Sequence, residues 1–543
     1  MWPEGRRHML RVEHLRLTPD HTARDLEYKI RKYLRIGRTT PMEYRIFRQS
    51  IDARKKPDIF YEYTVDVATP QESAILRKQR MGVRKIQEIH YQAPSHGEEP
   101  LLHRPVIAGC GPAGLFCAWL LAKEGYRPLL LERGAPVEER IRDVQTFWES
   151  GKLNPQSNVS FGEGGAGTFS DGKLNTLVKD TKGRNRLVLE SFVRFGAPEQ
   201  ILYMQKPHVG TDILCRIVRN MREEIQDLGG ETRFRHCLTG IHCQETGPKK
   251  ELRQIVLNHT EPLEAQVLVL ALGHSARDTF QMLYNNGLWM QAKSFAVGVR
   301  IEHPQQMIQQ MQYGEKWAGR LPAASYKLAE KLENGRGVYT FCMCPGGYVV
   351  NASSQEGYLA VNGMSYHGRA GENANSAVIV TVTPDDFESS HPLAGVEFQR
   401  RLEQRAFQVG EGAVPVQCFG DFCRRIVTKE FGEIRPQIKG AFRFADVRSV
   451  FPEELAVSLE KGILAMDRRI PGFAREDALL SAVESRTSSP VRILRDENFE
   501  GGIGGIYPCG EGAGYAGGIT SAAMDGLKTA EALIRRFSRP VEK

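Results

Sequence analysis

The sequence predicts an α/β protein that combines a parallel-sheet domain of alternating strands and helices, an antiparallel-sheet domain and a small α/β domain at the N-terminus. Three observations predict this. A strand, a glycine-rich turn and a helix occur at residues 104–123, and the same succession closes the chain at residues 505–537. Between them, runs of alternating apolar and polar residues fill residues 295–450. Strands that alternate with helices are typical of parallel sheets, and consecutive alternating runs are typical of antiparallel sheets.

Residues 1–98 are expected to form the small α/β domain, of ferredoxin-like type. Residues 9–17 alternate apolar and polar side chains as a half-buried strand does, and residues 21–37 place apolar side chains at helical spacing. Two further strand-like runs and a short helix-like run, residues 71–81, follow, and the polar stretch 91–100 is expected to be a linker.

The net charge of +8 lies entirely in this first domain. Residues 1–97 hold 20 Lys and Arg against 12 Asp and Glu, which leaves 53 of each in the remaining chain. Arg31, Lys32, Arg35 and Arg38 lie together on and after the predicted helix. A partner, RNA or a protein, is therefore one interpretation of this cluster, and a solvated helix face is the other.

The composition is that of a globular chain. Of 543 residues, 41% are hydrophobic and 25% charged, and the mean hydropathy is −0.38, which excludes wholesale disorder. The longest strongly apolar run, residues 267–272, is too short to cross a bilayer, and no secretory signal is visible. The ten cysteines have neither the spacing of a disulfide framework nor that of a zinc site. We expect a cytoplasmic protein with reduced thiols, no membrane association and no metal.

Gly109, Gly111 and Gly114 form a GxGxxG motif between the first strand of residues 104–123 and its helix. The first glycine can adopt the positive φ of a tight turn, the second lets a pyrophosphate approach the backbone, and the third lets helix and strand pack closely. The helix start at Pro112 and Ala113 offers free N–H groups and a positive dipole end to phosphates. The motif predicts a Rossmann-type dinucleotide-binding domain.

A carboxylate stands where such a domain needs one. Glu132 ends the next strand, 23 residues after Gly109. There it can accept both hydroxyls of an adenosine ribose, and it would repel a 2′-phosphate, so NADP is disfavoured at this site. The fingerprint by itself does not separate FAD from NAD.

The end of the chain favours FAD. Residues 507–526, YPCGEGAGYAGGITSAAMDG, resemble the second FAD motif of glutathione-reductase-type flavoproteins. The resemblance implies a ββα-type FAD-binding domain in which Glu511 binds the ribityl chain. It also implies that Gly517, Gly518, Ile519 and Thr520 begin a helix that faces the flavin ring, where a dipole of about half a positive charge would stabilise reduced flavin.

Two further segments match the same plan. Residues 263–280 resemble the strand that returns to the FAD domain, and the glycine-rich residues 158–174 occupy the position that wraps the pyrophosphate and ribityl chain. Together these segments are similar to a bacterial family of largely uncharacterised FAD-dependent dehydrogenases, or NAD(FAD)-utilizing dehydrogenases, with a small α/β domain ahead of the flavin domain. The resemblance covers nearly the whole chain from Met9 and implies redox chemistry without supplying a substrate.

The expected domains are residues 1–98, a first part of the FAD-binding domain at 99–294, an antiparallel substrate or cap domain at 295–495, and a closing FAD-binding segment at 496–543. The expected cofactor-binding residues are Gly109, Gly111, Pro112, Ala113, Gly114, Glu132, Arg133, Gly164, Gly165, Ala166, Gly167, Ala271, Gly273, Gly510, Glu511, Gly518 and Ile519.

Four residues inside the family motifs are candidates for catalysis. Lys206 and His208, in the segment that ends at Asp212, could orient or protonate a substrate or be structural. His274 follows the returning strand and could act on substrate or only hydrogen-bond locally. Arg486 offers a bidentate grip on a carboxylate or phosphate, or fixes a loop.

Cys342 and Cys344 make a CxC pair in a Pro-Gly turn. A redox dithiol is one interpretation, and buried structural cysteines are the favoured one. A second strand, GxGxxG and helix for a nicotinamide nucleotide is missing, since GGIGG at 501–505 has no helix after it. If NAD(P)H reduces the flavin, it must dock transiently.

The sequence therefore predicts a FAD-dependent oxidoreductase that acts on an unidentified small organic substrate by hydride transfer through flavin N5. Two alternatives stay open. One is an RNA-modifying flavoprotein that uses the basic first domain to bind RNA. The other is a flavin-dependent redox sensor or adaptor.

Overall fold

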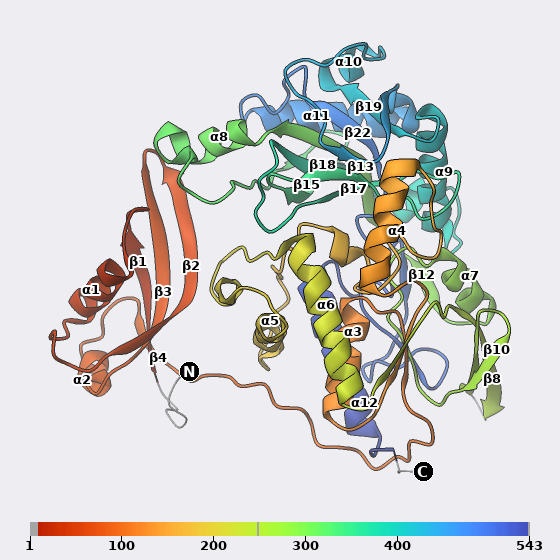
Figure 1. Ribbon diagram of the computed structural model, residues 1–543, viewed down its shortest axis with the longest axis horizontal. Coiled ribbons are helices and arrows are strands. Elements are labelled where there is room, and N and C mark those ends of the chain that lie inside the picture. The colour runs from red at the N-terminus through yellow and green to blue at the C-terminus, as the bar shows by residue number, and fades with distance from the viewer. Residues whose placement is uncertain (1–8, 247–248, 541–543) are drawn as a thin grey trace.

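The N-terminal region forms a four-stranded antiparallel sheet in a computed structural model, which describes residues 9–246 and 249–540 (Figure 1). Its strand order is β2-β3-β1-β4. Thr22 caps the first helix, because its hydroxyl accepts the N–H of Asp25 while the Asp25 carboxylate accepts the N–H of Thr22. The elements follow the βαββαβ order expected for this domain: β1 (Met9–Leu17), α1 (Ala23–Leu34), β2 (Glu43–Lys55), β3 (Asp58–Ala68), α2 (Glu72–Arg77) and β4 (Val83–Ile86).

Hydrogen bonds hold this sheet against the rest of the chain at two places. At one, the N–H of Gln49 donates to the carbonyl oxygen of Tyr203 (2.7 Å), and the N–H of Gln205 donates to that of Gln49 (2.9 Å). At the other, the indole N–H of Trp317 donates to the carbonyl oxygen of Pro57 (3.3 Å). Figure 1 shows the ends of β2 and β3 beside α8 (Gln305–Ala318), which carries Trp317.

A five-stranded parallel sheet forms the nucleotide-binding region. Its order is β24 (Ile506–Pro508), β11 (Leu268–Leu270), β5 (Val106–Ala108), β6 (Leu129–Glu132) and β7 (Glu231–Phe234). Its residues alternate between two cores: Ile107 packs with helices, whereas Val106 and Ala108 pack with a second sheet. The helices are α3 (Pro112–Lys123), α6 (Gly210–Asp227) and α12 (Ile519–Arg536). The second sheet is β10-β9-β8, of strands Glu261–Glu264, Lys249–Leu257 and Leu238–Thr246. The layers therefore run sheet, sheet, helices.

Smaller elements surround this sheet. They are α4 (Val137–Ser150), the short 3-10 helix at Ala166–Phe169, α5 (Arg184–Arg194), α7 (Arg277–Asn285) and the antiparallel pair β12 (Met290–Ala292) and β23 (Val491–Ile493). The carboxyl ends of β5, β6, β11 and β24 lie at one edge of the sheet, which is where open α/β sheets bind ligands.

A seven-stranded sheet occupies the middle of the chain, as its alternating runs predict. Its order is β14 (Ala329–Lys331), β15 (Gly337–Cys344), β18 (Asn373–Val382), β13 (Phe295–Pro304), β22 (Leu479–Glu484), β19 (Val414–Cys418) and β21 (Phe442–Phe444). The last pair is parallel, unlike the fully antiparallel sheet that was expected, because the chain crosses over between β19 and β21 through α10 (Phe419–Arg424). A small sheet, β17-β16-β20, joins Val361–Met364, Tyr348–Asn351 and Ile438–Lys439.

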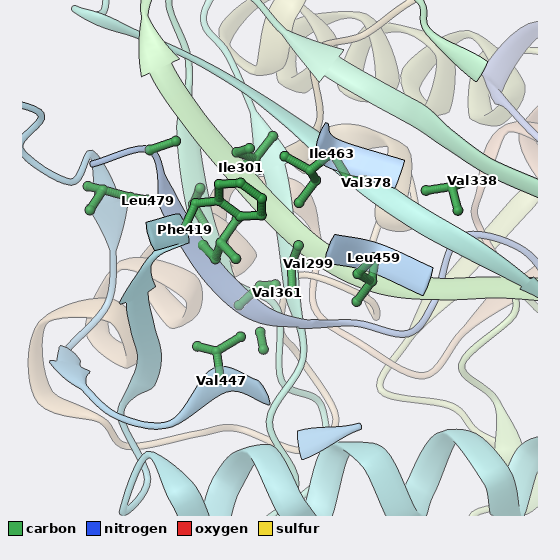
Figure 2. Packing of buried hydrophobic residues seen from close by; sticks show 14 of the residues in the cluster. Val299, Ile301, Val338, Val361, Val378, Phe419, Val447, Leu459, Ile463 and Leu479 are labelled. Atoms are coloured by element: carbon green, nitrogen blue, oxygen red, sulfur yellow. The ribbon is translucent and has the colours of Figure 1, made fainter. Parts of the chain in front are cut away.

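The largest apolar core lies on this middle sheet (Figure 2). Leu459 and Ile463 of α11 (Glu453–Asp467) belong to the same buried cluster as Val338 and Val378 of the sheet. At Gly462 an added Cβ would lie 2.5 Å from Val338, so a glycine allows the helix to approach closely. Another helix of this region, α9 (Ala394–Val409), faces the nucleotide-binding region. Across residues 9–246 and 249–540, no helix has both the length and the apolar character needed to cross a bilayer.

Candidate functional site

A cavity of about 670 Å³ lies between the carboxyl edge of the parallel sheet and the middle sheet. Its volume is within the roughly 300–1,000 Å³ of small-molecule sites. Most of the residues predicted to bind cofactor line it: Gly109, Gly111, Pro112, Ala113, Glu132, Arg133, Gly165, Ala166, Gly167, Ala271, Gly273, Glu511, Gly518 and Ile519. Segments from both ends of the chain thus meet in one cavity.

Three predicted glycines do not line the cavity but permit its walls to pack. At Gly114 an added Cβ would lie 1.8 Å from the carbonyl oxygen of Gly109. At Gly164 it would lie 2.0 Å from the Thr168 hydroxyl, and at Gly510 it would lie 2.6 Å from the Ala113 side chain. Gly114 therefore has the packing role that the motif predicts. Gly164 and Gly510 were expected to touch the cofactor. In the structure they lie behind the cavity wall, because the side chains of Thr168 and Ala113 pack against them.

The glycines that do line the cavity leave backbone open to it. At Gly273, Gly517 and Gly518 an added Cβ would meet nothing within 4 Å. At Gly111 the one neighbour within that distance is the Cα of Gly165, at 3.9 Å. Two helices begin at this wall, α3 after Gly111 and α12 after Gly518, and their first N–H groups have no partner inside the helix. Such a cradle fits a dinucleotide, with donors for a pyrophosphate at α3 and a positive dipole end at α12.

Glu132 is more fully occupied than the sequence suggests. Its carboxylate is buried and accepts the N–H groups of Cys110, Gly134 and Gly162, each at 2.9 Å. A carboxylate offers about four acceptor positions, so about one is left for a ligand. We expected it to bind both ribose hydroxyls. In the structure its first role is to tie the motif turn to the glycine-rich segment, because both need an acceptor there.

Arg140 of α4 holds the glycine-rich segment. Its side chain is fully buried and donates to the carbonyl oxygens of Asn158 (2.9 Å), Val159 (3.0 Å), Gly162 (3.2 Å) and Glu163 (2.6 Å). Burial lowers the pKa of Arg140 to about 10, so it stays charged at neutral pH. Sequence reasoning missed it. The available signal was an arginine at a buried helical position, with helical spacing from the apolar residues of α4.

Glu511, the expected ribityl ligand, lies on the cavity wall after β24. Burial raises the pKa of its carboxyl to about 7, against the opposing effect of the Lys293 charge. At neutral pH this residue can therefore accept or donate a hydrogen bond.

Arg486 holds a residue of its own chain. Its Nε and Nη2 lie 2.9 and 2.8 Å from the carboxylate oxygens of Glu403, and Nη1 donates to the hydroxyls of Ser354 and Ser275. Arg277 grips the same carboxylate at 2.7 and 2.9 Å. Although burial alone would raise it, the two guanidinium charges hold the pKa of Glu403 well below its usual range. The bidentate grip expected for a substrate is thus formed with Glu403, which favours the loop-fixing interpretation.

His274 lies on the cavity wall, with Nδ1 2.9 Å from the Ser275 hydroxyl. Burial, followed by the charges of Arg486 and Arg277, lowers the pKa of His274 to about 3. Its ring is therefore neutral at pH 7 and can serve as a hydrogen-bond partner but not as an imidazolium acid.

Lys206 and His208 are separated by the structure. Lys206 lines the cavity and donates to the Ser325 hydroxyl at 3.3 Å, and burial, with the charges of Lys173 and Arg369, lowers its pKa. His208 does not line the cavity. Its Nε2 donates to the carbonyl oxygen of His367 (3.1 Å), and the two rings stack with centroids 5.2 Å apart. Burial lowers the pKa of His208 to about 4, and of the two roles left open for it the contacts favour the structural one.

The cavity has a second end against the middle region, which was expected to be the substrate or cap domain. It is lined by polar and cationic side chains from the middle sheet and from the segment after the glycine-rich turn: Lys173, Ser325, Lys327, Thr340, Cys342, Asn362 and Arg369. The available signals were Lys173, at the end of the glycine-rich residues 158–174, and Cys342 of the CxC pair.

In the first domain, Arg31 donates to Glu27 and to the carbonyl oxygens of Gly37 and Thr40, so it closes its own helix end.

Two domain families and one relative of nearly the same length match this chain. Residues 294–487 match the family described as "FAD-dependent protein, C-terminal domain-like", and residues 9–68 match a domain of unknown function, DUF8436. A Clostridium beijerinckii protein described as uncharacterized is 46% identical over 541 residues, which cover 98% of this chain and 99% of that protein. Together with the cradle described above, the first match makes FAD the cofactor of this chain.

Solved structures are similar only at a low level. The halogenase PltM is 11% identical, with a TM-score of 0.36 over 79% of this chain and 67% of that one. The Escherichia coli quinol fumarate reductase subunit FrdA, as its E245Q mutant, is 11% identical, with a TM-score of 0.34 over 80% and 70%. We draw no functional conclusion from similarity of this degree.

Replacing Arg140 should loosen the glycine-rich segment. We expect Arg140→Leu to lower the free energy of unfolding by about 3 kcal/mol, because four carbonyl groups lose their donor, and to weaken FAD binding at least about tenfold. Denaturant unfolding and the ratio of flavin to protein absorbance measure both. Arg142→Leu, on the exposed face of the same helix, should change neither, and equal effects of the two variants would contradict the role assigned to Arg140.

Glu511 should make stability depend on pH. Its pKa is raised from 4.5 to about 7 in the folded chain, so folding stability falls as pH rises through this interval. In FAD-free protein, Glu511→Gln should therefore gain stability over the wild type between pH 5 and pH 8, by on the order of 1 kcal/mol. Thermal unfolding of both at each pH tests this, and a difference that does not change with pH would refute it.

Proposed function

This chain belongs to the family of the Clostridium beijerinckii protein and carries the C-terminal domain of FAD-dependent proteins, and we propose that it is an oxidoreductase that uses FAD to oxidise or reduce a small organic substrate. One observation carries the proposal. A single cavity has a dinucleotide cradle at one end and polar, cationic side chains at the other, so a cofactor and a substrate can share it.

The nucleotide end would hold FAD through backbone groups more than through side chains. The first turn of α3 would bind the pyrophosphate, the remaining acceptor of Glu132 a ribose hydroxyl, and Glu511 the ribityl chain. When bound, FAD accepts or donates hydride at N5 of its ring. The start of α12 at Gly518 and Ile519 would then favour negative charge on that ring.

The substrate end carries more positive than negative charge. Lys173, Lys206 and Arg369 line it, and Asp171 is the carboxylate that pairs with two of them. This surplus supports a substrate with an anionic group, which the lysines would orient toward the flavin. Lys206, with its lowered pKa, is the side chain placed to hold or move a proton there, whereas His274, neutral at pH 7, offers a hydrogen-bond partner on the cavity wall.

NAD(P)H is proposed as the electron donor, docking transiently at the same cavity. Within the described residues the five-stranded parallel sheet carries one GxGxxG turn, and FAD would occupy it. An RNA or protein partner at the basic first domain, in an RNA-modifying enzyme or a redox sensor, stays a prediction from charge. No contact of Arg31, Lys32, Arg35 or Arg38 favours either alternative over the oxidoreductase.

Purified protein should be yellow, with flavin absorbance that dithionite bleaches. Anaerobic mixing with NADH and with NADPH should reduce the flavin, and the reduced protein can then be screened for organic acids that reoxidise it. Lys206→Met should raise the KM for such an acid by about tenfold, because one charged contact is lost, while FAD content stays unchanged. A colourless protein that gains no FAD on reconstitution would refute the proposal. Flavin reduction without any organic acceptor would instead favour the sensor alternative.

A further inference from the structure

Two cysteines stand at the end of β15, one on the cavity wall and one behind it. Cys342 lines the cavity, whereas Cys344 is fully buried, with its Sγ donating to the carbonyl oxygen of Cys342 at 3.2 Å. The strand is irregular here. Cys342 has a φ of 41°, and the pairing with β18 shifts register between Phe341 and Cys344. Non-glycine residues in this left-handed region carry strain and cluster at functional sites.

The irregular backbone matters because a regular strand would hold the two cysteine side chains apart. Residues two apart in a strand have side chains that project in parallel from Cα atoms about 6.6 Å apart, close to the upper limit for a disulfide. A residue in the left-handed conformation breaks this parallel arrangement. The irregular end of β15 at Cys342 and Cys344 thus departs from the regular strand geometry, which would forbid a disulfide between residues two apart.

Two cations contact the backbone at Cys342 and Met343. Arg300 is fully buried, donating to the carbonyl oxygen of Cys342 (2.8 Å) and to the Glu484 carboxylate (2.7 Å). Lys173 donates to the carbonyl oxygen of the intervening Met343 and lines the same cavity. Both charges therefore lie next to the CxC turn, where they favour a thiolate over a thiol.

The thiol pKa of Cys342 is shifted in the opposite direction from that of the other nine cysteines. The neighbouring Cys344 thiol, with the charges of Arg300 and Lys173, lowers the pKa of Cys342. The pKa of each of the other nine is raised, mainly by burial in eight of them and by the neighbouring Cys342 in Cys344. The cavity wall therefore carries one thiol whose ionisation is favoured by its neighbours, with the buried Cys344 thiol behind it.

We propose that Cys342 and Cys344 are a redox dithiol that exchanges an electron pair with FAD across the cavity. The inference rests on the proposed function, since FAD must be bound there. In the oxidised pair a bond joins the two Sγ atoms. Two electrons and one proton from reduced FAD break it, so that Cys342 leaves as the thiolate beside Arg300 and Lys173, Cys344 leaves as the thiol, and FAD is oxidised. The reverse reaction forms the bond and reduces FAD.

The electron capacity of the FAD-loaded full chain tests this. The protein is oxidised with a mild thiol oxidant, desalted and titrated anaerobically with dithionite while flavin absorbance is followed. The wild type should take up about four reducing equivalents per FAD, two by the disulfide and two by the flavin, whereas Cys342→Ser and Cys344→Ser should take up about two. Peptide mass spectrometry after thiol blocking should find the 342–344 disulfide before the titration and two free thiols after it.

The control is Cys423→Ser, at a partly exposed cysteine of α10, which should keep the capacity of the wild type. The wild-type count needs no variant, so a substitution that fails to fold does not remove the test. A yellow wild-type protein that takes up two equivalents, or whose disulfide joins other cysteines, overturns the dithiol and leaves the proposed function standing. A colourless protein overturns both.

Discussion

The cavity depends on one buried carboxylate, Glu403. It belongs to α9 of the middle region, and it is gripped by Arg277 at the start of α7 and by Arg486 after β22. Removing either arginine would leave a buried charge partly uncompensated, which costs several kcal/mol. Because Arg277 follows the returning strand of the nucleotide-binding region, this ion cluster fixes the distance between the two walls of the cavity. Arg486 extends the cluster to Ser275 and Ser354, so residues next to His274 are held as well.

Buried charges also hold the nucleotide wall of the cavity. There they bind backbone carbonyl and N–H groups. Arg140 donates to four carbonyl groups of the glycine-rich segment, and Glu132 accepts three N–H groups from the turns on either side of it. Glycine-rich segments lose much conformational entropy on folding. The two buried charges offset part of that loss, and they leave the helix starts of α3 and α12 open for a ligand. The cradle is thereby ordered before any cofactor arrives.

Much of this site could be predicted from sequence because its parts are local. The GxGxxG turn, the strand that ends at Glu132 and the glycine-rich helix start at Gly518 each depend on neighbours in sequence, and each lies on the cavity wall. Contacts between distant segments could not be predicted. Nothing in the sequence near Arg486 indicates that Glu403 satisfies it, and the burial of His208 against His367 depends on a loop 159 residues away. The parallel pairing of β21 was missed for the same reason, since a crossover is decided by tertiary packing.

One segment of backbone, residues 203–206, is hydrogen-bonded to the first domain and also lines the cavity. Gln49 of β2 is bonded to Tyr203 and Gln205, and the residue after Gln205 is Lys206, which lies on the cavity wall. Cutting away residues 1–98 would therefore remove a partner of the segment that carries Lys206, and would strip Trp317 of its bond to Pro57. A truncated protein with altered turnover would not by itself identify a binding partner of the missing domain. Point substitutions on the outer face of α1 separate the two effects, since α1 packs on the face of its sheet that is turned away from α5 and α6 (Figure 1).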